Sequence, residues 1–344
     1  MGRSHTGSME TYIDDKLCNS IVERFYSMGY GNTPLLVFKL NNGSEVLAKA
    51  EWFNPSGSIK SRPAFFMIME RLMQNDLNRG KIFIEGTSGN TGIAIAEACK
   101  ALGLRSRIII PPGTMAETII KLRETGTDLV ITDEDPKTTS TEMAINTALS
   151  LSERYPDKYL SLHQHANPMN WISHYLTTGP EIKRVIKGRI DYVAIAMGTG
   201  GSIVGLSRFF KEKDGAINIM IQADPNSYIQ GIRNFRKAKD KKIIVDNMRY
   251  IDSIYTVSER EAMEGIKELA HNYGMMAGFS SGSNFMAAKR IALSNPNSRV
   301  LTVFPDSAEK YINLYHQSGI VEKEFLQNFD FKDLSILKGN VIAL

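Results

Sequence analysis

The sequence has little cysteine and no long apolar run, and each absence excludes a class of protein. Only Cys18 and Cys99 occur among the 344 residues, far apart and without the spacing of a metal site. Cys99 lies in an apolar, helix-like stretch, so we expect it to be a thiol packed in the core. No run is long and apolar enough to span a membrane, and no signal peptide is visible. We therefore expect a cytoplasmic protein without a membrane partner.

The sequence also lacks a strong excess of either charge. Its net charge at pH 7 is +4, which gives no reason to expect a nucleic-acid partner. The most basic segment, residues 233–242, is short and interrupted by Asp240. We interpret it as a solvated loop or as a rim that attracts an anionic substrate. Residues 1–8 resemble an added leader, with Met9 as the expected native start.

The most informative segment is residues 54–62, Asn-Pro-Ser-Gly-Ser-Ile-Lys-Ser-Arg, which places Lys60 between a turn and a helical pattern. Proline and glycine favour the turn, and the apolar run from Ala64 to Met73 favours a helix. A lysine held at such a junction can be partly desolvated, and desolvation lowers the pKa of its amine. A Schiff-base lysine needs such a lowered pKa. Most lysines are solvated surface charges, so Lys60 alone identifies no function.

Two glycine-rich turns follow apolar, strand-like runs and precede helical patterns. They span residues 85–92, Glu-Gly-Thr-Ser-Gly-Asn-Thr-Gly, and residues 198–202, Gly-Thr-Gly-Gly-Ser. Free backbone N–H groups at the start of a helix bind anions, and hydroxyl groups in such a turn add further donors. Each turn taken alone could also be an ordinary link between a strand and a helix.

Neither turn has a nucleotide-binding pattern, because Ile203 stands where the third glycine of a dinucleotide fingerprint would be and no Gly-Lys-Ser/Thr sequence occurs. Two anion sites and a candidate Schiff-base lysine instead indicate a phosphorylated aldehyde cofactor. A third cluster, Ala277–Ser283, precedes another helical run. Its serines could cap that helix, or one hydroxyl could pair with a pyridine nitrogen, which favours β-elimination over transamination.

Together these motifs resemble the cysteine synthase and cystathionine β-synthase family, the pyridoxal-phosphate-dependent β-family of fold type II. The resemblance runs from Gly31–Leu35 to Phe304–Tyr311. It implies an α/β fold with two domains, each a mostly parallel sheet flanked by helices, and with the cofactor in the cleft between them. It implies a large cofactor-binding domain at residues 9–45 and 160–344 and a small, mobile substrate domain at residues 46–159. A homodimer is usual in this family.

The resemblance also implies roles for individual residues. Lys60 is the implied attachment point of pyridoxal 5′-phosphate and the catalytic lysine, Ser280 the partner of the pyridine nitrogen, and Thr178 a neighbour of the cofactor phosphate. No metal is implied. The remaining contacts are a phosphate loop, Gly198, Thr199, Gly200, Gly201 and Ser202, and a substrate-carboxylate set, Thr87, Ser88, Gly89, Asn90, Thr91 and Gln164. Asn90 is also expected to hydrogen-bond the ring oxygen of the cofactor.

Two positions depart from the usual family pattern. Ser61 stands where cysteine synthases usually carry aspartate, which we expect to affect packing near the site. Arg233 follows Gly231-Ile232, where many relatives that use O-acetylserine carry glycine and some that use O-phosphoserine carry arginine. An arginine fork can bind a substrate phosphate. Arg233 could equally be an exposed loop cation.

The implied reaction is a β-replacement that makes L-cysteine from an activated serine and sulfide through an aminoacrylate intermediate. The activated serine is O-phosphoserine or O-acetylserine. The same motifs also fit cystathionine β-synthase or serine sulfhydrase activity, cysteine desulfhydration and diaminopropionate synthesis, because the choice of acceptor depends on cleft shape. Asp224 could activate water at the β-carbon or could simply end a strand. The intact Lys60, Asn90 and Ser280 argue against a non-catalytic binding protein.

The coarse pattern alternates strand-like and helical runs, as a mostly parallel sheet requires. We expect strands at residues 108–111, 129–131, 192–196, 217–223 and 300–304. We expect helices at residues 62–75, 92–102, 116–125 and 259–273.

Overall fold

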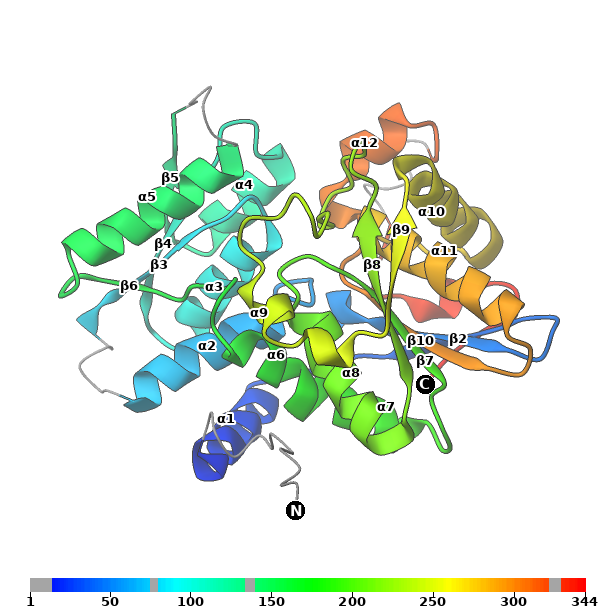
Figure 1. Cartoon of the computed structure of the whole chain (residues 1–344). Helices are drawn as coiled ribbons and strands as arrows, with labels where there is room; N and C mark the ends of the chain where they lie inside the picture. Colours follow the sequence, from blue (N-terminus) through cyan, green and yellow to red (C-terminus); the bar gives the residue numbers. More distant parts are fainter. Residues whose placement is uncertain (1–13, 75–79, 134–139, 322–328) are drawn as a thin grey trace, which may run out of the picture.

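The structure is a computed structural model that describes residues 14–74, 80–133, 140–321 and 329–344. The expected leader, residues 1–8, lies outside these ranges. The described strands form two sheets flanked by helices, which confirms the predicted α/β class (Figure 1). No helix among the described residues is long and apolar enough to cross a membrane.

The larger sheet has seven strands, and its order places β10 at the centre. Strand β1 runs antiparallel to both of its neighbours, and the other pairs are parallel. In sheet order the strands are β11 (Val341–Ala343), β1 (Leu35–Lys39), β2 (Glu45–Ala50), β10 (Arg299–Phe304), β7 (Tyr192–Ala196), β8 (Ile217–Ala223) and β9 (Ser253–Val257).

The smaller sheet has four parallel strands. In sheet order they are β5 (Asp128–Ile131), β4 (Arg105–Ile110), β3 (Ile82–Gly86) and β6 (Tyr159–Ser161). The boundary predicted at residue 46 needs a correction. Strand β2 pairs with β1 and β10, so residues 46–50 belong to the larger sheet.

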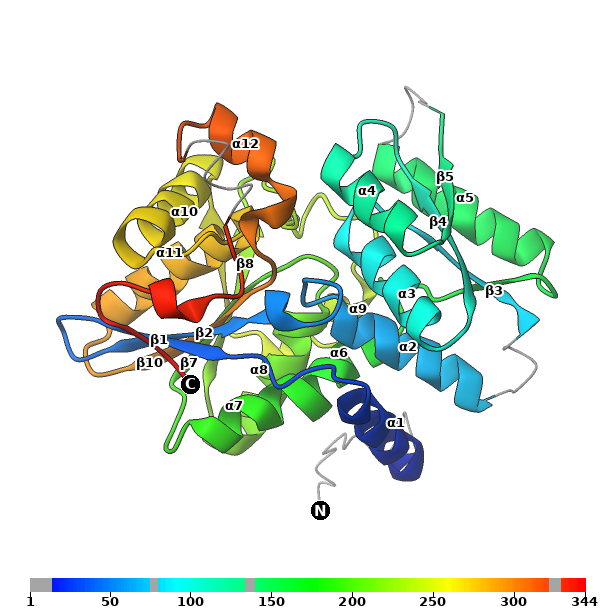
Figure 2. The ribbon, with the colours of Figure 1, turned by 180° about the vertical axis from the view of Figure 1, so that it is seen from behind.

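Helices cover both faces of each sheet. Figure 2 shows α3 and α4 on the face of the smaller sheet opposite α5. On the larger sheet, α10 and α11 cover one face, and α7 and α8 cover the other. The helices are α1 (Asp15–Ser27), α2 (Ser61–Gln74), α3 (Asn90–Ala101), α4 (Ala116–Glu124), α5 (Ser140–Arg154), α6 (Met169–Ser173), α7 (Gly179–Val185), α8 (Gly201–Asp214), α9 (Lys242–Val245), α10 (Glu259–Tyr273), α11 (Phe279–Ser294) and α12 (Ile312–Gln317).

Short helical turns complete the described secondary structure. They are the 3₁₀ turns η2 (Glu51–Phe53), η5 (Met248–Tyr250), η6 (Ala308–Lys310) and η7 (Leu334–Ile336), and the π-helical turn η4 (His174–Thr178). The last of these joins α6 to α7.

One apolar core connects the two sheets. It extends from Ile108 in the smaller sheet through Phe65 on α2 to Trp171 on α6 and Leu301 in the larger sheet. Cys99 is fully buried in the same core, as its apolar surroundings predicted. Because α2 packs against both α3 and α6, the helix that begins directly after Lys60 belongs to the joint between the two sheets.

Candidate active site

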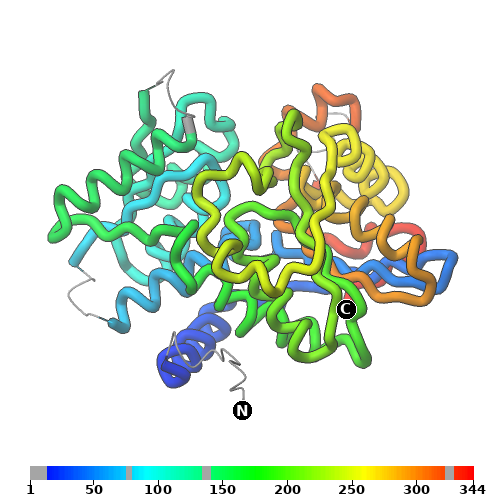
Figure 3. The backbone as a smooth tube through the Cα atoms, viewed as in Figure 1, coloured from blue at the N-terminus to red at the C-terminus, as the bar shows by residue number. Residues whose placement is uncertain are grey.

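The loops that follow the carboxyl ends of β3, β7, β8 and β10 line one cavity of about 550 Å³ between the two sheets. The chain after β8, yellow-green in Figure 3, crosses from the larger sheet toward the smaller one. The carboxyl edge of parallel strands is the usual place for a ligand in such sheets. The predicted site residues that line the cavity are Lys60, Thr87, Ser88, Gly89, Asn90, Thr91, Gln164, Gly198, Thr199, Ser202, Arg233 and Ser280.

The other predicted residues lie behind the cavity wall. Gly200 caps the start of α8 with a φ of 95°, and Gly201 is the first residue of that helix. Thr178 is fully buried, and its hydroxyl lies 3.0 Å from His174 Nδ1. The place of Thr178 near a cofactor phosphate therefore stays a prediction.

Three helices begin at the cavity with glycine at the N-cap and no side-chain cap. These are α3 after Gly89, α8 after Gly200 and α11 after Gly278. The first backbone N–H groups of a helix have no partner within the helix. Their dipoles also favour negative charge. The cavity can therefore bind more than one anionic group.

The turn at the start of α8 has no space for side chains. A Cβ atom on Gly201 would lie 1.9 Å from Asn170 Oδ1. The same amide donates through Nδ2 to Thr199 Oγ1 at 3.0 Å. Asn170 thus holds the turn close to α6 and orients the Thr199 hydroxyl.

Lys60 is held by the turn in residues 54–62, here called the Lys60 turn, which is hydrogen-bonded to the chain after β10. Gly57 has a φ of 70°, a conformation that suits glycine. The backbone N–H of Ile59 donates to Pro305 O at 2.8 Å, and Ser58 forms a β-bridge with Asp306. Ser61, the departure from the family pattern, is buried and lies 2.7 Å from the Ser56 hydroxyl, which closes the turn.

The surroundings of Lys60 favour its neutral amine. Burial lowers the pKa of Lys60, and the charge of Lys310 lowers it further, whereas Asp306 acts in the opposite direction. No ion pair of Lys60 is found among the residues that the structure describes. A neutral amine can act as a nucleophile or a base, which is the chemistry that the sequence predicted for this residue.

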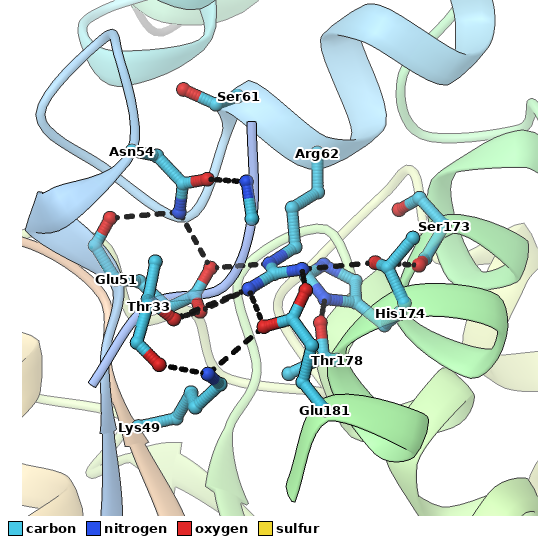
Figure 4. A network of polar contacts seen from close by, with 12 residues as sticks. Thr33, Lys49, Glu51, Asn54, Ser61, Arg62, Ser173, His174, Thr178 and Glu181 are labelled. Atoms are coloured by element: carbon cyan, nitrogen blue, oxygen red, sulfur yellow. Dashed lines mark hydrogen bonds and ion pairs between the residues drawn. The ribbon is translucent and has the colours of Figure 1, made fainter. Parts of the chain in front are cut away.

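A buried charge network lies directly behind the Lys60 turn (Figure 4). We call it the Arg62 cluster, and it consists of Arg62, Lys49, Glu51 and Glu181. Arg62 Nε donates to Glu51 Oε2 at 2.7 Å, and Arg62 Nη1 donates to Glu181 Oε1 at 2.7 Å. Lys49 Nζ lies 2.9 Å from Glu181 Oε2. Two cations and two carboxylates balance, and they tie α2 to η2 and α7.

A second, largely buried group of polar residues lines the cavity together with Lys60. We call it the Asp306 cluster, and it consists of Asp306, Lys310, Asn90 and Tyr311. Asp306 Oδ2 accepts hydrogen bonds from Asn90 Nδ2 and from the Tyr311 hydroxyl, each at 2.7 Å. Lys310 Nζ lies 3.4 Å from the same oxygen and donates to Asn90 Oδ1. Sequence analysis assigned no role to Asp306 or Lys310, although both lie in the last family-like segment.

Arg233 lines the cavity, where burial lowers its pKa and the charge of Asp240 acts in the opposite direction. Its Nη1 lies 3.1 Å from both His165 Nδ1 and the Asp240 carbonyl oxygen. Burial, Arg233 and Lys60 lower the pKa of His165 to about 3, so this imidazole is neutral at pH 7. Among the described residues Arg233 has no ion pair, because its hydrogen-bond partners are uncharged. Asp224 also lines the cavity, and its carboxylate accepts from the Asn226 backbone at 2.8 Å.

Residues 26–306 match the family model of pyridoxal-phosphate-dependent enzymes. The chain belongs to this family. Cysteine synthase B of Salmonella typhimurium is 36% identical over 287 residues, which cover 82% of this chain and 92% of that relative. An O-acetylserine-dependent cystathionine β-synthase of Bacillus subtilis is 32% identical over 292 residues, covering 82% of this chain and 94% of that relative.

A solved structure agrees with these relatives. The O-acetylserine-dependent cystathionine β-synthase of Helicobacter pylori superimposes with a TM-score of 0.71 at 29% identity, covering 88% of this chain and 98% of that one. The predicted membership of the cysteine synthase and cystathionine β-synthase family, the fold and the cofactor are thus confirmed.

The residues of the cavity fit pyridoxal 5′-phosphate. Its phosphate needs a site with several N–H donors, which the uncapped start of α8 offers beside Thr199 and Ser202. Its aldehyde needs an amine, and Lys60 lines the same cavity. Ser280, on the first turn of α11, offers an uncharged hydroxyl.

Proposed function

We propose that this enzyme makes L-cysteine by replacing the β-substituent of an activated serine with sulfide. The observation that supports this most is the position of Lys60, a half-buried amine in a cavity that three uncapped helix starts approach. When bound, pyridoxal phosphate supplies a ring that stabilises negative charge on the α-carbon of an amino acid. Proton transfer and binding of the substrate depend on the side chains around that ring.

Lys60 has two roles in this proposal. It holds the cofactor covalently between substrates, and its freed amine takes the α-proton of the bound amino acid. Ser280 would pair with the pyridine nitrogen through an uncharged hydroxyl. Unlike a carboxylate, a hydroxyl does not keep that nitrogen protonated, so the ring would withdraw electrons only moderately. This property favours loss of a β-substituent over transamination.

The loop from Thr87 to Thr91 and Gln164 hold the substrate carboxylate. The loop contains the start of α3, where backbone N–H groups are free to bind an anion. Thr91 Oγ1 donates to Gln164 Oε1 at 2.7 Å, so the two elements are already joined. Because Gln164 accepts this bond through Oε1, its Nε2 is the donating end: it hydrogen-bonds Glu85 and has a second hydrogen that can go to the substrate carboxylate.

We assign O-phosphoserine as the activated serine because Arg233 forms no close ion pair with the described residues, Asp240 reaching it only through its carbonyl oxygen and a longer-range charge. Its Nη1 is held by two uncharged groups, His165 and the Asp240 carbonyl, and the cation lines the cavity. A guanidinium held in this way can donate to a phosphate through two parallel hydrogen bonds. O-acetylserine, the donor named for two of the relatives, has no such charge.

A visible absorbance titration of the purified holoenzyme tests this assignment. Each donor is added without sulfide, and the change in the cofactor band gives its apparent Kd. We expect Arg233→Ala to weaken O-phosphoserine binding by about tenfold or more, because a hydrogen bond between charged groups is lost. O-acetylserine binding should change little. Arg236→Ala, at an exposed cation of the same segment, is the matched control. Equal losses with both donors would leave Arg233 without a phosphate role.

Cystathionine synthesis is the second candidate, because two of the relatives are O-acetylserine-dependent cystathionine β-synthases. Supplying homocysteine in place of sulfide, and identifying the product by mass, separates the two activities. The division into a cofactor-binding domain and a mobile substrate domain stays a prediction. The homodimer and the cytoplasmic location also stay predictions.

A further inference from the structure

Lys310 is a buried lysine of the cavity that the reaction above does not use. Only 2% of its surface is exposed, although it belongs to the cavity wall. Burying an ammonium group is costly unless it is paired and hydrogen-bonded. Lys310 meets this condition with Asp306, at 3.4 Å, and with Asn90 Oδ1. It is therefore held in one position beside a residue of the substrate loop.

The two partners of Asn90 fix the orientation of its amide. An ammonium group can only donate, so the atom that faces Lys310 must be the carbonyl oxygen. An ionised carboxylate can only accept, so the atom that faces Asp306 must be the nitrogen, 2.7 Å away. Without these partners the amide could turn over at little cost, since its two ends have nearly the same shape.

This orientation leaves one N–H of Asn90 without a partner among the described residues. The amide nitrogen carries two hydrogens, and one of them goes to Asp306. Asn90 lines the cavity together with Lys60, so the second N–H is available to a ligand there. A turned amide would present an oxygen, which would repel an anionic or carbonyl-like acceptor.

The Asp306 cluster also connects the two sides of the cleft. Asn90 starts α3, on the smaller sheet, whereas Asp306 and Lys310 follow β10 of the larger sheet. The backbone bridge between Ser58 and Asp306 fixes the same cluster to the Lys60 turn. The position of the Asn90 amide is therefore set relative to the Lys60 amine.

We propose that Lys310 is a positioning residue: together with Asp306 it orients the Asn90 amide so that an N–H, not the carbonyl oxygen, meets the bound cofactor and amino acid. The inference rests on the proposed function, because it assumes that an amino acid binds beside Lys60. In this proposal Lys310 does not contact the reacting atoms. Lys310 acts only by orienting Asn90.

The test is an absorbance titration of the holoenzyme with O-acetylserine, without sulfide. We expect Lys310→Met to raise the apparent Kd about tenfold, the effect of one misdirected hydrogen bond in a buried site. Lys310→Arg, which keeps both the charge and the donors, should restore most of the affinity. Lys289→Met is the matched control, since Lys289 forms an ion pair with Glu268 at 2.5 Å and does not line the cavity.

A double-mutant cycle with Asn90→Ala separates positioning from a general effect on stability. If Lys310 acts through Asn90, Lys310→Met should not weaken binding further once the Asn90 amide is gone. An equal weakening in both backgrounds, or none in either, would overturn the inference. If wild-type holoenzyme shows no spectral response to either O-acetylserine or O-phosphoserine, the proposed function fails instead.

A second variant covers the case in which Lys310→Met does not fold. Removing Lys310 alone leaves the Asp306 carboxylate buried without its cation, which can be strongly destabilising. The double substitution Lys310→Met with Asp306→Asn removes both charges together. Its asparagine can donate or accept, so it no longer fixes the Asn90 amide. We expect the same loss of affinity in a folded protein, and unchanged binding would contradict the inference.

Discussion

The Arg62 cluster and the Asp306 cluster both contact the segment that carries Lys60, and they differ in how completely their polar atoms are paired. In the Arg62 cluster every carboxylate oxygen accepts at least one hydrogen bond from a buried donor. In the Asp306 cluster, Asp306 Oδ1 is buried and no described residue hydrogen-bonds it. One N–H of Asn90 is also unused among the described residues.

This difference indicates different tasks. A closed network of buried charges has nothing left to offer a ligand, and it fixes the backbone around it. Burial opposes ionisation of Glu181, but Arg62 and Lys49 outweigh this effect and hold the pKa of that carboxyl well below its usual range. An open network keeps donors and acceptors for what binds in the cavity. We infer that the Arg62 cluster fixes the position of Lys60, and that the Asp306 cluster binds and orients the ligand beside Lys60.

Replacing Lys60 should give the largest effect on turnover. Lys60→Ala leaves both clusters intact, and Lys60 has no ion pair of its own among the described residues. We expect cysteine formation to fall by about 10³-fold or more, because a positioned proton acceptor is lost together with the cofactor attachment. The protein should still unfold cooperatively. Near-normal cysteine formation by this variant would refute the assignment of Lys60.

Breaking the closed cluster should give the largest effect on stability. Arg62→Met leaves Glu51 and Glu181 buried with too little positive charge. We expect the free energy of unfolding to fall by about 3–5 kcal/mol in urea denaturation. Arg62→Lys is the informative control, since it keeps the charge but cannot reproduce the forked contacts. Stability equal to wild type in Arg62→Met would show that the cluster does not anchor the Lys60 turn.

Glu85 tests the comparison at a buried carboxyl outside both clusters, for which no ion pair is found among the described residues. Burial raises the pKa of Glu85 to about 7, against hydrogen bonds from Gln164 and the backbone of residues 162–164. Because the folded-state pKa lies above the ordinary value of 4.5, its contribution to stability is complete below pH 4.5 and is lost as the pH rises through 7. The total loss should be about 3 kcal/mol.

The measurement for Glu85 is the free energy of unfolding of wild type and Glu85→Gln between pH 5 and pH 8. The difference between the two proteins should change over this range in favour of the variant as the pH rises. Glu124→Gln, at an exposed position, should show a constant difference from wild type. A constant difference for Glu85→Gln as well would mean that Glu85 is already ionised at pH 5.

The parts of the site that the sequence predicted are those that short contiguous motifs encode. Strands β7 and β8 match the expected ranges residue for residue, because each is rich in apolar, β-branched residues. Helix α10 does so because Ser258 and Glu261 form a capping box at its start. The Lys60 turn and the glycine-rich turns are equally local, and the structure brings them to one cavity.

Contacts between distant segments could not be predicted in this way. Asn90 and Lys310 are 220 positions apart, and Arg62 and Glu181 are 119 apart. The misplaced boundary at residue 46 has the same cause, because only pairing with β10 assigns β2 to the larger sheet. Strand β4 begins at Arg105, earlier than expected, because the exposed Arg105 and the half-buried Arg107 flank the buried Ser106, so the apolar run begins only at Ile108.

The smallest expected effect comes from an ion pair that crosses the cleft near the surface. Lys239 Nζ lies 2.8 Å from Glu142 Oε1, with 74% of the Lys239 side chain exposed. Water and salt screen such a pair, so we expect a coupling energy below about 1 kcal/mol in a double-mutant cycle with Lys239→Ala and Glu142→Ala. The coupling should fall further at high salt. The coupling energy could instead be as large as the fall in unfolding free energy in Arg62→Met. Burial would then not separate charges that stabilise the fold from charges that do not. The distinction between closed and open clusters would no longer explain the site.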